Sequence, residues 1–143
     1  MDKKVVLVSH GKLSEGVASA VEMVFGKNDA LSYLGLAPDG DVVELIAGLK
    51  EEVKAHPDTQ YVVLADIYGG SVCTQCFMQL NGLCNVHLIA GLSMPLALGV
   101  VSIPGALTDA QIAQAIADAK DGVQEVALSC DLDQTDDGGD DFF

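Results

Sequence analysis

Residues 4–11 read Lys4-Val5-Val6-Leu7-Val8-Ser9-His10-Gly11, a short β-branched run that is almost continuously apolar until it stops at a histidine and a glycine. Such a run is typical of a strand that is covered on both faces in a parallel sheet. From Ser14 to Gly26, apolar residues recur every three or four positions, which predicts an amphipathic helix with Ser14 as its N-cap. The chain therefore opens with a strand–helix unit.

This unit repeats along the chain. Apolar runs predict strands at 31–36, 61–65 and 86–90, and a final strand at 123–128. Capping residues predict helix starts at Asp41 and Thr108, and the Gly69-Gly70-Ser71 segment opens a third helix; these helices end near residues 55, 119 and 81, and a short apolar helix precedes Ser102. Parallel neighbours need a crossover that includes a helix. The pattern therefore predicts a single-domain, doubly wound α/β fold with a mainly parallel open sheet and helices on both faces.

Length and charge limit the function. The chain has 143 residues, the size of one domain, and its seven basic residues, all lysines, oppose 21 acids to give a net charge of −14. A nucleic-acid role therefore lacks its usual electrostatic driving force. We expect residues 1–130 to form the domain. Residues 131–143 contain six aspartates and no base, and we expect an acidic, disordered tail there.

The cysteines and the apolar stretches indicate a cytoplasmic protein. Four cysteines are too few for a disulfide scaffold, and the first apolar run is too short for a signal peptide. No charged residue lies between Asp66 and Asp109, but glycines and prolines interrupt this stretch before it could span a membrane, so a buried core or a subunit contact is the interpretation. Cys73 and Cys76 lack the further ligands of a zinc site, so we expect helix packing and no metal.

Two candidate site residues follow separate strands. Ligands bind at the carboxyl ends of strands in open α/β sheets. His10 ends the first strand and Asp66 follows the third, so the two converge if these strands are neighbours. A carboxylate that accepts a hydrogen bond from Nδ1–H fixes the imidazole tautomer and leaves Nε2 as a nucleophile or a base.

Gly69, Gly70 and Ser71 lie between Asp66 and the third helix. The glycines let the backbone approach a ligand closely, and the free N–H groups at the helix start form a nest for an anion together with the Ser71 hydroxyl. Because the chain has no arginine, this nest is the arrangement in the sequence suited to holding a phosphoryl group. A phosphoryl group on Nε2 of His10 would fit it, and no cofactor is needed.

Three loop motifs occur in order at the ends of the expected strands. The first is VLVSHG at residues 6–11, which SEG follows at 14–16; the second is DIYGGS at 66–71, and the third is AGLSMP at 90–95. Together they resemble the IIA domain of the mannose family of the bacterial phosphoenolpyruvate-dependent sugar phosphotransferase system (PTS). The resemblance spans about residues 4–120.

The resemblance implies a phosphocarrier. Its histidine, His10 here, would take a phosphoryl group on Nε2 from the carrier protein HPr and pass it to a IIB domain, serving the IIC and IID membrane subunits indirectly. Asp66 would orient His10, and the phosphoryl-binding positions would be Gly11, Gly69, Gly70 and Ser71. The resemblance also implies a homodimer in which the C-terminal strand can be exchanged between the two copies.

The chain departs from the family pattern at two positions. The family often places a hydroxyl or aromatic residue after the aspartate and a proline after the serine, where this chain has Ile67 and Val72. Three alternatives stay open. The phosphotransfer subunit of a dihydroxyacetone kinase shares the fold and the histidine, a receiver domain would use Asp66 but lacks the acidic pair for Mg²⁺, and a non-catalytic regulatory module would keep the fold alone. The sugar is not encoded, because the membrane subunits select it.

Overall fold

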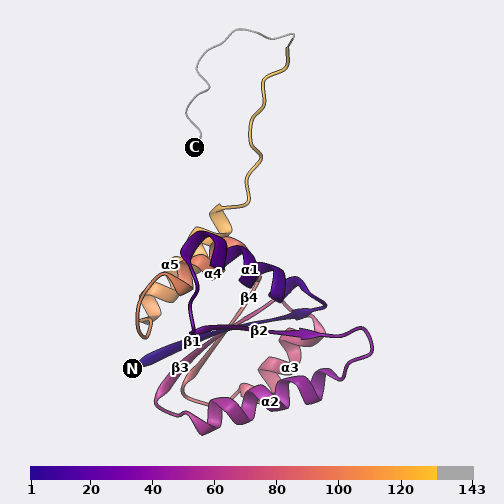
Figure 1. The fold of residues 1–143 in the computed structure, drawn as a ribbon, viewed down its shortest axis with the longest axis vertical. Coiled ribbons are helices and arrows are strands. Elements are labelled where there is room, and N and C mark those ends of the chain that lie inside the picture. The colour runs from indigo at the N-terminus through magenta and orange to yellow at the C-terminus, as the bar shows by residue number, and fades with distance from the viewer. Residues whose placement is uncertain (132–143) are drawn as a thin grey trace.

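A computed structural model describes residues 1–131 of the chain. Four parallel strands form one sheet in the order β2-β1-β3-β4. The strands are β1 (Asp2–His10), β2 (Leu31–Leu36), β3 (Thr59–Ala65) and β4 (Val86–Ala90). The helices are α1 (Leu13–Phe25), α2 (Val42–Ala55), α3 (Ser71–Leu80), α4 (Met94–Val101) and α5 (Asp109–Asp121). Figure 1 shows α1, α4 and α5 on one face of the sheet and α2 and α3 on the other. The predicted doubly wound α/β fold is confirmed.

The side chains of β1 alternate between two cores, one on each face of the sheet. Val5 and Leu7 belong to the core that includes residues of α1 and α4, whereas Val6 and Val8 belong to the core that includes residues of α2 and α3. This alternation is the period of two that a strand imposes. It explains why the first run of the sequence is apolar at every position rather than at every second one.

The predicted caps are correct for two helices and wrong for one. Asp41 caps α2 by accepting hydrogen bonds from two backbone N–H groups, and Thr108 caps α5 and forms a capping box with Gln111. Ser14 is not the N-cap of α1, because the helix starts at Leu13 and Lys12 occupies the cap position without a side-chain hydrogen bond. The hydroxyl of Ser14 is instead buried and donates to a strand carbonyl, a partner that helical periodicity cannot reveal.

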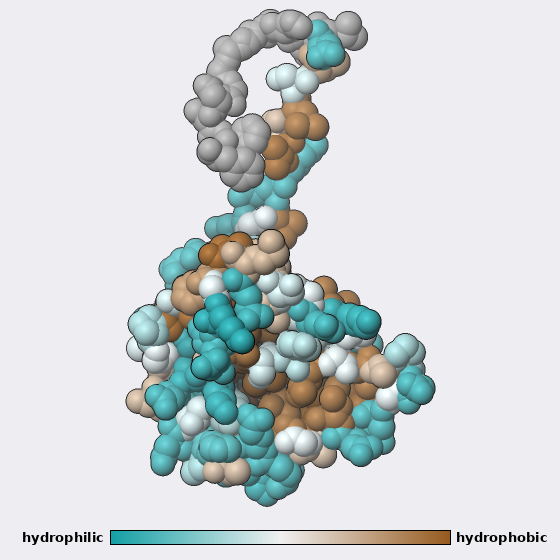
Figure 2. All heavy atoms as spheres, in the orientation of Figure 1, coloured by the Kyte–Doolittle hydropathy of each residue, from teal (hydrophilic) through white to brown (hydrophobic). Residues whose placement is uncertain are grey.

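The predicted final strand at 123–128 is wrong for a single copy of the chain. Residues 123–130 form no strand, and Figure 1 shows this segment leaving the body beyond α5. Figure 2 shows that the segment carries hydrophobic side chains away from the body; Val123 and Leu128 are each 88% exposed. A strand needs a neighbour to satisfy its N–H and C=O groups, and this segment lies on neither edge of the described sheet.

The expected acidic tail falls almost wholly outside the described residues, which include only Asp131 of it, so the domain boundary at residue 130 stays a prediction. Across residues 1–131, no helix combines the length and the apolar character that crossing a bilayer requires.

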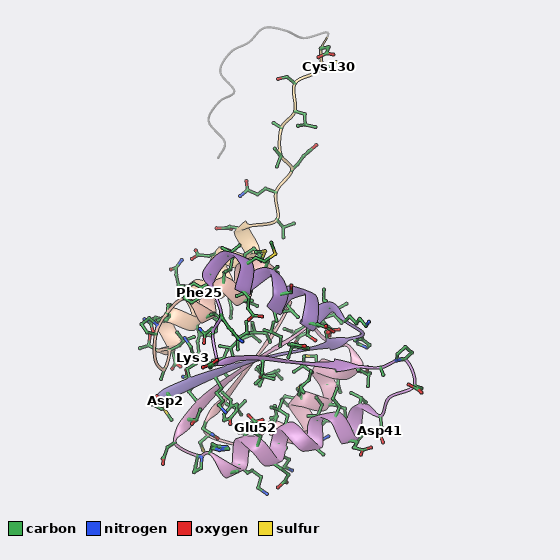
Figure 3. All side chains as sticks on the ribbon, viewed as in Figure 1. Asp2, Lys3, Phe25, Asp41, Glu52 and Cys130 are labelled. Atoms are coloured by element: carbon green, nitrogen blue, oxygen red, sulfur yellow. The ribbon has the colours of Figure 1, made fainter. Side chains whose placement is uncertain are left out.

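The charge-free stretch contributes to both cores but is only partly buried, since Tyr68, Phe77 and Met78 are exposed. Leu96, Ala97, Val100 and Val101 of α4 are buried, as are the interior positions of α3. Figure 3 labels Lys3 near the amino end of β1, at the opposite end of this strand from His10. The ammonium group of Lys3 donates hydrogen bonds to the carbonyl oxygens of Val100 and Ile103, where α4 ends. Burial lowers the pKa of Lys3.

Gly35 of β2 lies in close contact with the turn after β1. A Cβ atom at position 35 would lie 2.4 Å from the carbonyl oxygen of Gly11, and both groups are backbone, so neither can rotate away. We therefore expect Gly35→Ala to lower the free energy of unfolding by about 1–3 kcal/mol, the usual cost of overpacking. Urea denaturation measures this change.

Gly48 provides the matched control, because it is exposed within α2 and a Cβ atom there would meet nothing within 4 Å. Gly48→Ala should raise the free energy of unfolding by about 0.5–1 kcal/mol, since alanine is the better helix former. The same effect from both substitutions would contradict the predicted close contact.

Candidate active site

The site lies where the strand order reverses. β1 and β3 are neighbours, with Val8 opposite Ala65, so the residues that follow both strands meet at one edge of the sheet. The chain after β1 enters α1 on one face, and the chain after β3 enters α3 on the other face. Because the two connections diverge, the space between them is open to a ligand.

His10 and Asp66 are brought together as the sequence predicts. The Nδ1 atom of His10 lies 2.6 Å from Oδ2 of Asp66. The same oxygen accepts a hydrogen bond from the backbone N–H of His10 at 2.8 Å, and Oδ1 accepts one from the N–H of Ile67 at 2.9 Å. The carboxylate side chain is 9% exposed and the imidazole 51% exposed. A nearly buried carboxylate thus holds one side of a ring that solvent and partners can reach.

The surroundings of Asp66 keep it ionised. Burial by itself raises the pKa of this carboxyl group. The hydrogen bonds from the backbone and ring of His10 and from the N–H of Ile67, together with the charge of His10, lower the pKa by more than burial raises it, so the pKa lies below its ordinary value. At neutral pH the carboxylate therefore accepts a hydrogen bond from Nδ1–H. The lone pair of the imidazole is then on Nε2.

Nε2 of His10 faces the start of α3. The Oγ atom of Ser71, the first residue of this helix, lies 3.1 Å from Nε2. The first hydrogen bond within the helix runs from the N–H of Thr74 to the carbonyl of Gly70 at 2.8 Å. The N–H groups of residues 71–73 therefore have no partner within the helix, and they point out of its N-terminal end. Together with the helix dipole they favour an anion beside Nε2.

The glycines contribute in different ways. Gly69 has a φ of +81°, which a residue with a side chain rarely adopts, and it turns the chain into α3. A Cβ atom on Gly70 would lie 2.6 Å from Cγ2 of Ile67 and 3.8 Å from Cε1 of His10. The N–H of Gly11 already donates to the carbonyl of Leu36 at 2.8 Å, so Gly11 supplies the turn after His10 and no free amide.

Ile67 and Cys76 lie close to this site in different environments. Ile67 has no hydroxyl, yet its backbone N–H binds Asp66. Cys76 is buried in the core, where burial above all, with Cys73 and Asp66 nearby, raises the pKa of its thiol to about 12. This agrees with the packing role predicted for it. Within residues 1–131, no group of three His, Cys, Asp or Glu side chains could hold a metal ion.

One feature of the surface beside the site was missed by the sequence prediction. A cavity of about 470 Å³ adjoins Gly69, and its wall combines side chains of the loop before α3, of α3 and of β4: Tyr68, Cys73, Thr74, Phe77, Leu88 and Ala90. Tyr68 and Phe77 are 88% and 60% exposed. No local sequence signal could have indicated this hollow, because it forms only where α3 packs beside the edge strand.

Comparison with known proteins identifies the family. The family model described as PTS system fructose IIA component matches residues 4–120. The sorbose-specific EIIA component of the PTS of Klebsiella pneumoniae is 28% identical over 96 residues, which cover 67% of this chain and 70% of that protein.

Solved structures share the fold. One from Klebsiella pneumoniae subsp. pneumoniae, described as a proposed phosphoenolpyruvate-dependent sugar PTS permease, has a TM-score of 0.77 at 25% identity and covers 87% of this chain and 91% of its own. The mannose/sorbose specific IIA subunit of the phosphotransferase system from Enterococcus faecalis has a TM-score of 0.79 at 22% identity, with 90% and 98% covered. The match over residues 4–120 shows that the chain belongs to the PTS fructose IIA component family.

Proposed function

We propose that His10 is the phosphoryl acceptor through which this IIA family member acts as a phosphocarrier in a sugar PTS. One observation carries the assignment: Asp66 lies at 2.6 Å from Nδ1 of His10, while Nε2 faces the hydroxyl of Ser71 and the start of α3. The donor is HPr and the acceptor is a IIB domain, both in the cytoplasm, and the IIC and IID membrane subunits are served indirectly.

The proposed transfer exchanges one N–P bond for another. The lone pair of Nε2 attacks the phosphorus of the donor phosphohistidine, the N–P bond of the donor breaks, and the electron pair of that bond returns to the donor imidazole. The proton on Nδ1 of His10 stays on the ring, which becomes cationic, and the adjacent Asp66 carboxylate stabilises that charge. The free N–H groups of α3 and the Ser71 hydroxyl stabilise the negative charge on the three phosphoryl oxygens.

The assignment of His10 predicts the fate of the phosphoryl group. After incubation with phosphoenolpyruvate, enzyme I and HPr, the wild-type protein should carry one acid-labile phosphoryl group, and His10→Ala should carry none, as measured by intact-mass analysis. His87→Ala is the control, because His87 lies within β4 and should leave phosphorylation intact. A base-labile adduct that persists in His10→Ala and disappears in Asp66→Ala would instead indicate a receiver-like domain.

The contacts of the ring predict graded losses of rate. Ser71→Ala removes the hydroxyl 3.1 Å from Nε2, and Asp66→Asn removes the charge that stabilises the cationic ring. A hydrogen bond to a charged group contributes about 1.5–3 kcal/mol, so each substitution should slow single-turnover phosphorylation by about 10- to 100-fold. Ser102→Ala, an exposed hydroxyl after α4, is the control and should leave the rate unchanged. Wild-type rates in both site variants would contradict these roles.

The proposal includes a homodimer with exchanged C-terminal strands. The segment 123–128 carries three exposed apolar side chains, those of Val123, Val126 and Leu128. β4 is an edge strand of the described sheet. An apolar segment and an open edge each lack a neighbour in a single copy. Two copies can supply the missing neighbour to each other by β-strand addition.

Truncation tests the dimer. A chain that ends at Gly122 loses the segment and should be monomeric at tens of micromolar, whereas a chain that ends at Cys130 loses only the acidic tail and should remain dimeric, as measured by light scattering after size-exclusion chromatography. A dimer that survives truncation at Gly122, or a monomeric full-length chain, would overturn the strand exchange.

A further inference from the structure

Two buried serines fasten the turn that carries His10. The Oγ atom of Ser9 accepts a hydrogen bond from the backbone N–H of Ser14 at 2.8 Å, and the hydroxyl of Ser14 donates to the carbonyl of Leu34 at 2.9 Å. Both serine residues are fully buried. The first bond joins the end of β1 to the first turn of α1, and the second joins α1 to β2.

The first bond replaces a helix cap. Lys12 occupies the N-cap position of α1 without a side-chain hydrogen bond, so the orphan N–H groups of the first turn need other acceptors. Ser9 supplies one of them from within the strand. The bond spans residues 9 to 14, and the chain that it closes contains His10 and Gly11.

The turn is also fixed against β2. The N–H of Gly11 donates to the carbonyl of Leu36 at 2.8 Å, and a side chain on Gly35 would collide with the carbonyl oxygen of Gly11. With the bond from Ser14 to Leu34, the turn and the start of α1 together lie against three consecutive residues of β2. Its backbone is therefore held from the strand side and from the helix side at once.

The position of this backbone decides the orientation of the ring. Oδ2 of Asp66 accepts hydrogen bonds from the backbone N–H of His10 at 2.8 Å and meets Nδ1 at 2.6 Å. Both contacts are kept only if the backbone of residue 10 stays in place. The ring itself is half exposed, so side-chain packing does little to hold it.

Ser9 acts from the opposite face of the sheet. Along β1, Val5 and Leu7 face the core on the α1 side, and Val6 and Val8 face the core on the α3 side. The alternation continues with Ser9 toward α1 and His10 toward Ser71 of α3. Ser9 is therefore separated from a phosphoryl group on Nε2 by the sheet.

We propose that Ser9 and Ser14 are positioning residues for phosphoryl transfer, which hold the backbone of His10 so that Nδ1 stays on Asp66 and Nε2 stays aimed at the start of α3. This inference rests on the proposed role of His10 as phosphoryl acceptor. Without the Ser9 hydroxyl, the turn loses its link to α1, and the ring exchanges between its two neutral tautomers.

The test compares Ser9→Ala, Ser14→Ala and Ser9→Thr in the full-length chain. Single-turnover phosphorylation by phospho-HPr gives the rate constant at saturating donor and the donor concentration for half saturation, and ¹⁵N NMR of the His10 ring gives its tautomer. A neutral hydrogen bond contributes about 0.5–1.5 kcal/mol, so Ser9→Ala should lower the saturating rate constant about 2- to 10-fold with an unchanged half-saturating concentration. Ser14→Ala should have the same sign and a smaller size, because its backbone N–H still binds Ser9. Ser9→Thr keeps the oxygen and should restore both rate and tautomer.

Val100→Ala is the control for lost stability. Val100 of α4 is fully buried in the core that includes Val5 and Leu7 of β1, and its carbonyl accepts a hydrogen bond from Lys3 at the opposite end of β1 from His10. Truncation of its side chain therefore weakens the packing against β1 and leaves the turn after His10 intact. Val100→Ala should leave the saturating rate constant and the tautomer as in the wild type. An equal loss of rate in Val100→Ala, or wild-type rate and tautomer in Ser9→Ala, would overturn the positioning role while His10 phosphorylation stands. An unphosphorylated His10 in the wild-type chain would overturn the proposed function itself.

Discussion

The parallel pairing of β1 with β3 is the constraint on which the site depends. Both strands are central in the sheet and paired on both sides, and their apolar side chains fill a core on each face. Because the pairing is parallel, both strands end at the same edge, and the register with Val8 opposite Ala65 places His10 and Asp66 within hydrogen-bond distance. A shift of one residue would turn the side chain of His10 to the other face and separate the pair.

In the proposed transfer, backbone groups stabilise the negative charge of the phosphoryl group. The chain has no arginine, and the described contacts of His10 involve a carboxylate, a hydroxyl and the start of a helix. Backbone N–H groups at a helix start are fixed by the fold, so the proposed phosphoryl transfer would not require them to reorganise. The same logic applies to Asp66, whose orientation is set largely by the N–H groups of His10 and Ile67. Because the bond comes from the backbone of residue 67, the isoleucine found there can hold the Asp66 carboxylate in place without a side-chain hydroxyl.

The alternation along β1 turns the side chains of its last two residues to opposite faces of the sheet. His10 faces the side where α3 begins, and Ser9 faces the side where α1 begins. The sheet thus separates the proposed phosphoryl acceptor from the residue proposed to hold its backbone. Two glycines near the site allow close packing because they have no side chain. Gly35 lies directly against the carbonyl of Gly11, and Gly70 lies against Ile67.

The sequence by itself determined the four strands, the helices between them, two of the caps, and the placement of His10 and Asp66 at strand ends. These features follow from hydrophobic periodicity and capping chemistry, which are local properties of the chain. The tertiary structure decided the rest. Ser14 is a residue type that favours the N-cap position, but its hydroxyl binds β2, and the N–H of Gly11 binds the carbonyl of Leu36. Local patterns miss both bonds because each partner lies at least 20 positions away in the chain. The run at 123–128 has the composition of a strand and forms none in one copy, since a strand exists only where a neighbour accepts its hydrogen bonds.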